Sequence, residues 1–274
     1  MIKILEWSLF MTFSLVCSLI AFGFLIRFIE NKSNTYIYNT FGKTGLIGYG
    51  ILGTTIHEFS HFLMAKLFFH KIIDIKWFSL SINNNGELGH VTHSYNKKNL
   101  YQRIGNFFIG TAPLLIGSLI LIFFYWLLLR NSFYTILNHI NLDNFLNLGS
   151  TFTFTSFFKL LLSKFSFILQ NTFTLSNFES LSFWIFLFIS ISISTHMSLS
   201  RADLKNAIDG ILFIFIFSLI VNGIFLLLSI SFSTLGFYLI SFNIFLISFL
   251  SIGLFFSLLS LIISFLFFSV KKLF

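Results

Sequence analysis

Two histidines and a glutamate stand at the spacing of metal ligands in the segment GTTIHEFSHFLMAKLF. His57 and His61 are four residues apart, so on a helix their rings share one face and can reach a single ion. Glu58 lies beside that face, where its carboxylate can take a proton from a water whose pKa a metal has lowered. The sequence therefore predicts one Zn²⁺ ion bound by His57 and His61, with Glu58 as the catalytic base of a peptide-bond hydrolase.

The apolar setting of this segment makes its polar residues costly. Each ionisable side chain at the centre of a membrane-spanning helix costs about 2.5 to 3.5 kcal/mol on insertion scales, and metal coordination would offset that cost. The alternative is a polar cluster that joins helices, or part of an ion or proton pathway. A non-catalytic membrane protein, either such a conductor or a degenerate protease scaffold that binds partners, is therefore the second hypothesis.

A catalytic zinc site needs a third protein ligand, because the fourth position is left to water. The candidates are Asp203 and Asp209, both in the segment SISISTHMSLSRADLKNAIDGILF. Asp203 follows an interruption at residues 198–201 and stands near the N-cap of a new helix, where its carboxylate can turn inward. This placement favours Asp203, and Asp209, about one and a half turns later, is the alternative.

Other residues could act near the metal. His196 could orient the substrate or stabilise an oxyanion, or it could be a histidine satisfied by backbone carbonyls at a helix break. Asn106 could donate a hydrogen bond to a substrate carbonyl. Pro113, with Gly110 and Gly117, makes its apolar segment flexible and closely packed, which suits a helix beside the metal but equally suits ordinary membrane packing.

The composition places the chain in a lipid bilayer. Hydrophobic residues make up 56% of it and charged residues only 9%, too little polar surface for a water-soluble globule. Lys and Arg are scattered between apolar stretches, which excludes nucleic acid as a partner. We expect an all-α polytopic membrane protein with a single integral membrane domain, residues 1–274. Its six expected membrane spans are residues 7–28, 44–69, 104–129, 182–199, 206–231 and 236–268.

The distribution of Lys and Arg favours cytoplasmic N- and C-termini. The first apolar run is too long for a typical signal peptide, so we expect it to stay as a helix. The abundance of Phe, Ile, Asn and Ser favours a bacterial cell membrane. Cys17 is the only cysteine, so a disulfide framework or thiolate metal site is excluded. The sequence does not fix the oligomeric state.

Two connections between spans carry structure of their own. Strand-like runs flank the turn sequence NNNG at residues 83–86, which predicts a β-hairpin over about 72–95. Residues 156–171 have a polar helical stripe and are expected to lie along the membrane surface. His90 and His93 should point to opposite faces of their strand, as headgroup-level residues.

Together these features resemble the site-2 protease family of intramembrane zinc metalloproteases. The resemblance lies in HEFSH, the following hairpin, GNFFIGTAPLLIGSLI at residues 105–120, and a late Asp after an interrupted span. The family's late motif resembles N-x-x-P-x-P-P-x-D-G, with its Asp as third ligand. Thr195 to Asp203 matches the interval from that Asn to that Asp, whereas Asp209 matches only the Asp-Gly pair.

The prolines of that late motif are missing here, which indicates a divergent member of the family. The resemblance covers a core of about residues 44–210. It implies cleavage of membrane-embedded or membrane-proximal protein or peptide substrates, and an exposed hairpin edge could take up such a substrate as an added strand.

Overall fold

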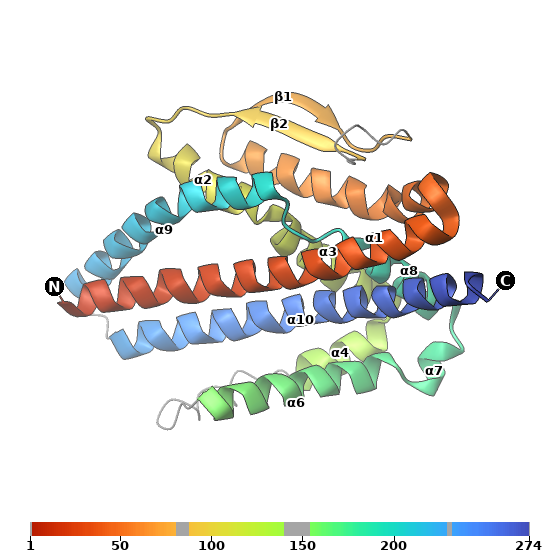
Figure 1. Ribbon diagram of the computed structural model, residues 1–274. Coiled ribbons are helices and arrows are strands. Elements are labelled where there is room, and N and C mark those ends of the chain that lie inside the picture. Colours follow the sequence, from red (N-terminus) through yellow and green to blue (C-terminus); the bar gives the residue numbers. More distant parts are fainter. Residues whose placement is uncertain (1, 81–87, 140–153, 229–231, 274) are drawn as a thin grey trace.

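The computed structural model describes residues 2–80, 88–139, 154–228 and 232–273. These residues are mostly helical, with one small antiparallel sheet, as the sequence predicts (Figure 1). The elements in chain order are α1 (Ile2–Leu67), β1 (Lys71–Lys76), β2 (His90–Ser94), α2 (Leu100–Gly110), α3 (Ala112–Leu128), α4 (Arg130–His139), α6 (Phe154–Thr172), α7 (Leu175–Phe178), α8 (Leu181–Thr195), α9 (Arg201–Leu227) and α10 (Phe232–Lys271).

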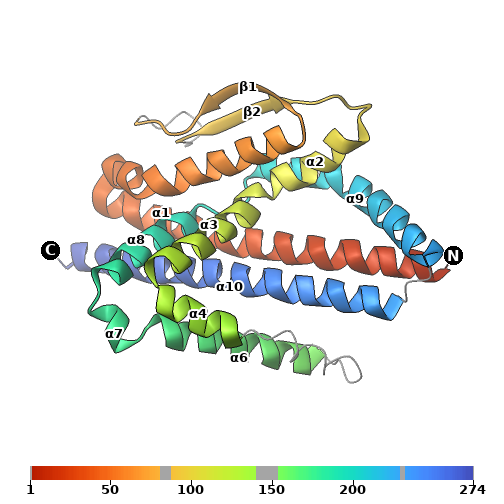
Figure 2. The same cartoon turned by 180° about the vertical axis from the view of Figure 1, so that it is seen from behind.

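Helix α1 is a helical hairpin. Its backbone leaves helical geometry at Gly42, where φ is 68° and ψ is −156°, a left-handed conformation that glycine adopts without a steric cost. The first half runs beside α10, and the second half folds back beneath the β-hairpin (Figures 1 and 2). Residues 29–43, expected to be a loop between two spans, are therefore helical apart from this bend.

The third expected span, residues 104–129, is broken into α2 and α3, which meet at an angle of 61°. Pro113 stands in the first turn of α3, where its fixed φ is compatible with a helix start. A Cβ at Gly110 would lie 2.3 Å from the carbonyl oxygen of Asp203. The glycine therefore lets the end of α2 approach the start of α9.

Strands β1 and β2 pair in antiparallel register, with Lys71 opposite Ser94 and Lys76 opposite His90. A register shift falls between Ile72 and Asp74. The expected hairpin is thus confirmed, and its turn at residues 83–86 lies outside the described residues.

Within the described residues, two helices are long and apolar enough to cross a membrane: α9, and residues Leu246–Lys271 of α10. The bent pair of α2 and α3 would make a third span. These helices indicate membrane association, but they are fewer than the six spans expected. Helix α8 has 15 residues, short of the roughly 20 that a span needs, and several side chains of residues 7–28 lie outside the described part.

Helix α6 contains the segment expected to lie along the membrane surface. The four polar residues along one face of this helix are all exposed: Lys159, Ser163, Ser166 and Gln170. Ile168, in contrast, is buried. This burial fits an amphipathic helix, and its place at the surface of the bilayer stays a prediction.

The connection between α8 and α9 is anchored in the core. Met197 and Leu199 are each 1% exposed and pack in one apolar cluster with Leu19, Phe107 and other residues of α1, α2, α3 and α10. This segment is therefore held in place from several sides, although it has no regular structure.

Candidate metal centre

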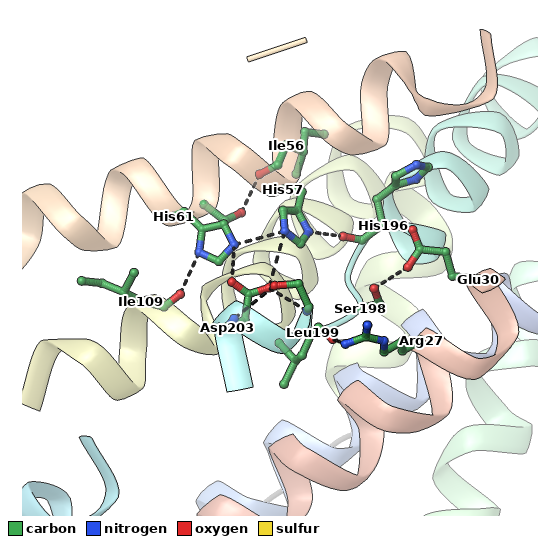
Figure 3. Close-up of polar contacts among 12 residues, drawn as sticks. Arg27, Glu30, Ile56, His57, His61, Ile109, His196, Ser198, Leu199 and Asp203 are labelled. Carbon is green, nitrogen blue, oxygen red and sulfur yellow. Dashed lines mark hydrogen bonds and ion pairs between the residues drawn. The ribbon is translucent and has the colours of Figure 1, made fainter. Parts of the chain in front are cut away.

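The side chains of His57, His61 and Asp203 converge at one point between α1 and α9 (Figure 3). Each offers a ligand atom, and these atoms lie within 4.8 Å of one another. The two Nε2 atoms are 3.1 Å apart, and Asp203 Oδ1 lies 3.2 Å from Nε2 of His61. The structure thus brings together three residues from two distant helices, and we call them the metal group.

The other ring nitrogens of both histidines contact backbone carbonyls. Nδ1 of His57 lies 2.6 Å from the oxygen of His196, and Nδ1 of His61 lies 2.9 Å from that of Ile109. Because a carbonyl only accepts hydrogen bonds, each Nδ1 must carry the proton. In the neutral ring each Nε2 then has a lone pair that can bind a metal. Histidine ligands of metals are commonly oriented in this way.

Two lone pairs and a carboxylate that face one another repel unless a positive charge lies between them. Bonds of about 2.0 to 2.1 Å to a tetrahedral ion would place its ligand atoms roughly 3.3 Å apart, close to the contacts of His61 with His57 and Asp203. A set of two imidazoles and one carboxylate suits a transition metal such as zinc. The metal group could therefore hold a metal ion.

Both carbonyls are available because a helix is interrupted beside them. Pro113 has no N–H, so it cannot donate to Ile109, the residue four positions earlier. His196 is the C-cap of α8, and no residue of that helix follows it. The ends of α2 and α8 thus supply the carbonyl acceptors that orient the two histidine rings.

Asp203 is positioned by a capping box at the start of α9. Its backbone N–H donates to Ser200 Oγ at 3.1 Å, and its Oδ2 accepts from the N–H of Ser200 at 2.7 Å. This exchange fixes the carboxylate in the first helical turn, where it is 6% exposed. The interruption before α9 therefore positions Asp203 as the sequence predicts.

Asp209, the alternative ligand, faces a different set of partners. It accepts hydrogen bonds from the Tyr95 hydroxyl at 2.9 Å and from Asn106 Nδ2 at 2.6 Å, and Arg103 lies 3.7 Å away. These contacts tie the end of the hairpin and α2 to α9. The structure places neither Asp209 nor Asn106 in the metal group.

His196 reaches the site through its backbone. Its ring nitrogen Nδ1 lies 3.0 Å from the carbonyl of Ser192, and its own carbonyl accepts from His57. His196 is among the residues that border the cavity of the metal group, but in Figure 3 its ring points away from His57, His61 and Asp203. The structure therefore shows the histidine satisfied by a backbone carbonyl at the helix break, and it is the backbone of His196, not its ring, that contacts the metal group.

Comparisons with protein-family models, with curated proteins and with solved structures find no match for the chain. What the site can do is therefore inferred from its own residues.

Glu58 is 7% exposed and borders a cavity of about 400 Å³ that also contains the metal group. The start of β2 lies close to Glu58: a Cβ added at Gly89, the residue before the strand, would lie 2.8 Å from Cγ of Glu58. The cavity has polar walls from α1, β2 and the start of α9. A carboxylate, the metal group and a cavity with room for water and a ligand thus occur together.

Sequence reasoning missed two sets of residues that border this cavity. One is Arg27, Glu30, Asn31 and Asn34 in the first half of α1, outside the expected core of residues 44–210. Their helical spacing would have indicated one face if residues 29–43 had been taken as helix. The other set is His90 and His93, which were expected at headgroup level on opposite faces but both border the cavity.

His93 forms a pair with His70, which is buried. Their Nδ1 atoms are 3.0 Å apart, and Nε2 of His70 lies 2.9 Å from the carbonyl of Gln102. Burial lowers the pKa of His70, and burial together with the charge of His70 lowers the pKa of His93 to about 4. Both rings are therefore neutral at pH 7, and one N–H lies in the hydrogen bond between their Nδ1 atoms.

Proposed function

We propose that this chain is an intramembrane zinc metalloprotease that resembles the site-2 protease family. Its substrates are membrane-embedded or membrane-proximal proteins or peptides. The observation that carries the proposal is the convergence of His57, His61 and Asp203 on one point of a polar cavity that Glu58 also borders. This combination supplies three protein ligands and a separate carboxylate, as zinc-dependent hydrolysis requires.

His57, His61 and Asp203 would hold a single Zn²⁺. When bound, zinc would polarise the scissile carbonyl and lower the pKa of a water molecule. Glu58 would accept the proton of that water and return it to the leaving amine. The carbonyls of Ile109 and His196 would hold the histidine rings in the tautomer that binds a metal.

The hairpin would present the substrate. Peptide bonds within a helix already have their hydrogen bonds satisfied, so the substrate must bind locally unwound. In the described sheet β2 pairs only with β1, and residues Leu88 to Val91 border the cavity. The other edge of β2 can therefore take up an extended peptide beside the metal group.

The protein would act as a multi-pass membrane protein with about six spans, in a bacterial cell membrane and with a cytoplasmic N-terminus. The two or three apolar helices of sufficient length support a location in the bilayer. The exposed polar residues of α6 support a surface position for that helix.

A pair of variants tests the proposed reaction. Zinc-loaded wild type and Glu58→Gln are incubated in detergent with a fluorescent transmembrane peptide whose helix contains a central Gly-Pro break. We expect cleavage by the wild type, at least about 100-fold slower cleavage by Glu58→Gln, and equal zinc content in both. Equal cleavage rates would remove Glu58 from its role, and no cleavage by either would oppose the proposed activity.

A further inference from the structure

The first half of α1 presents four polar residues to the cavity of the metal group. Arg27, Glu30, Asn31 and Asn34 follow the spacing of one helix face, and all four border this cavity. Ile29, between them in sequence, is 5% exposed and faces the apolar core. We call these four residues the polar stripe.

Two members of the polar stripe hold the connection between α8 and α9. Nη1 of Arg27 donates to the carbonyl of Leu199 at 2.8 Å, and Glu30 accepts a hydrogen bond from the hydroxyl of Ser198 (Figure 3). This connection carries the carbonyl that orients His57 and leads into Asp203. Arg27 and Glu30 therefore have a structural role that accounts for their charges.

That role rests on Arg27 and Glu30, and Asn34 contributes to it only through its hydrogen bond with Glu30. Asn31 is exposed, and Asn34 is half-buried, with its side chain in hydrogen-bonding reach of Glu30. An asparagine amide offers two N–H donors and one carbonyl acceptor, the same groups as a peptide bond. These two side chains can therefore pair with the main chain of a bound peptide.

An unwound peptide needs such partners on more than one side. Strand β2 can satisfy only the N–H and C=O groups that face its edge, and within a bilayer each group left without a partner is costly. In Figures 1 and 2 the β-hairpin lies above the second half of α1, and the first half of α1 lies below that second half. Because both border one cavity, a peptide that extends from β2 past the metal group meets the polar stripe.

We infer that Asn31 and Asn34 form a subsite that binds the main chain of the unwound substrate beyond the hairpin. The inference rests on the proposed protease function and adds a second recognition surface to it. The ligand is an extended peptide with free backbone amides, and side-chain identity matters little at this subsite.

Binding of two hydroxamates to the zinc-loaded full-length protein tests the subsite without catalysis. Acetohydroxamic acid probes the metal alone. A leucine pentapeptide whose second peptide bond is N-hydroxylated carries the same metal-binding group, with backbone amides on both sides. We expect the Asn31→Ala/Asn34→Ala variant to bind the pentapeptide about tenfold more weakly and acetohydroxamic acid as tightly as the wild type.

Asn39→Ala is the matched control, because Asn39 is an exposed asparagine on the same helix that does not border the cavity. It should bind both probes like the wild type. Unchanged pentapeptide affinity in the double variant, or an equal loss for both probes, would overturn the subsite. Failure of acetohydroxamic acid to bind the wild type would instead overturn the metal site, and the subsite with it.

Discussion

Nδ1 of His61 lies 2.9 Å from the carbonyl oxygen of Ile109, an oxygen that receives no helical hydrogen bond from Pro113, because proline has no N–H. The same relationship holds for His57, whose Nδ1 contacts the carbonyl of His196 at the end of α8. Each ring is thus oriented by a carbonyl released at a helix break. The interruptions of these helices belong to the metal centre as much as the histidines do.

Replacing the proline should weaken metal binding. In Pro113→Ala the new N–H competes with His61 for the carbonyl of Ile109, and the bend between α2 and α3 relaxes. We expect the zinc affinity to fall about 10- to 100-fold, as for the loss of other partners of metal-bound histidines. Competition with a chromogenic chelator measures the affinity. Leu119→Ala, an exposed site on α3, is the control, and equal affinities in both variants would show that the missing N–H of Pro113 is dispensable for metal binding.

The two aspartates of α9 should respond differently to the same substitution. Asp203→Asn removes a negative ligand of the metal group, so the purified protein should lose its stoichiometric zinc. Asp209→Asn should keep the zinc but unfold at a lower temperature, because it loses the ion pair with Arg103 and weakens the bonds from Tyr95 and Asn106. Zinc lost from Asp209→Asn alone would reverse the assignment.

Two glycines in the second half of α1 test the packing that holds the site. A Cβ at Gly53 would lie 2.2 Å from the carbonyl of Ser192 and 2.3 Å from Nδ1 of His196. Gly53→Ala should therefore destabilise the protein by about 1 to 3 kcal/mol. A Cβ at Gly48 would have no neighbouring atom within 4 Å, so Gly48→Ala should stabilise the helix by about 0.5 to 1 kcal/mol. Thermal unfolding in detergent compares them, and equal midpoints would contradict the close approach of α1 to α8.

The pair of His70 and His93 should make the stability depend on pH. Both pKa values lie below the ordinary value of 6.5 in the folded protein, that of His93 at about 4. The unfolded chain therefore binds more protons in this window, so stability is complete above pH 6.5 and falls as the pH drops toward 4. The unfolding midpoint of His93→Gln should fall less steeply over this range than that of the wild type. Parallel pH profiles of the two proteins would contradict a neutral pair.

Much of the metal centre could be predicted from local spacing. The interval between His57 and His61 requires only a helix, and the position of Asp203 follows from the interruption and the capping residue before it. The hairpin was recognisable because strand-like runs flank a turn sequence. Each of these predictions depends on residues that are close together in the chain.

Contacts between distant parts of the chain could not be predicted in this way. Asp209 is bound by Tyr95 and Asn106, more than 100 residues earlier, so its local Asp-Gly context suggested a role as ligand that its partners do not support. Arg27 and Glu30 reach the site only because α1 folds back at Gly42 and packs beside the segment after α8. The described residues contain fewer helices of sufficient length than the six spans expected, because apolar composition does not reveal a bend or a short helix.

Zinc-edge X-ray absorption of the purified wild type, with its metal content measured on the same sample, tests the metal centre most directly. We expect one zinc per chain, with two imidazole nitrogens and at least one oxygen at about 2.0 to 2.2 Å. A protein without a stoichiometric transition metal, or with a zinc shell that lacks two imidazoles, would contradict the convergence of His57, His61 and Asp203 on one ion.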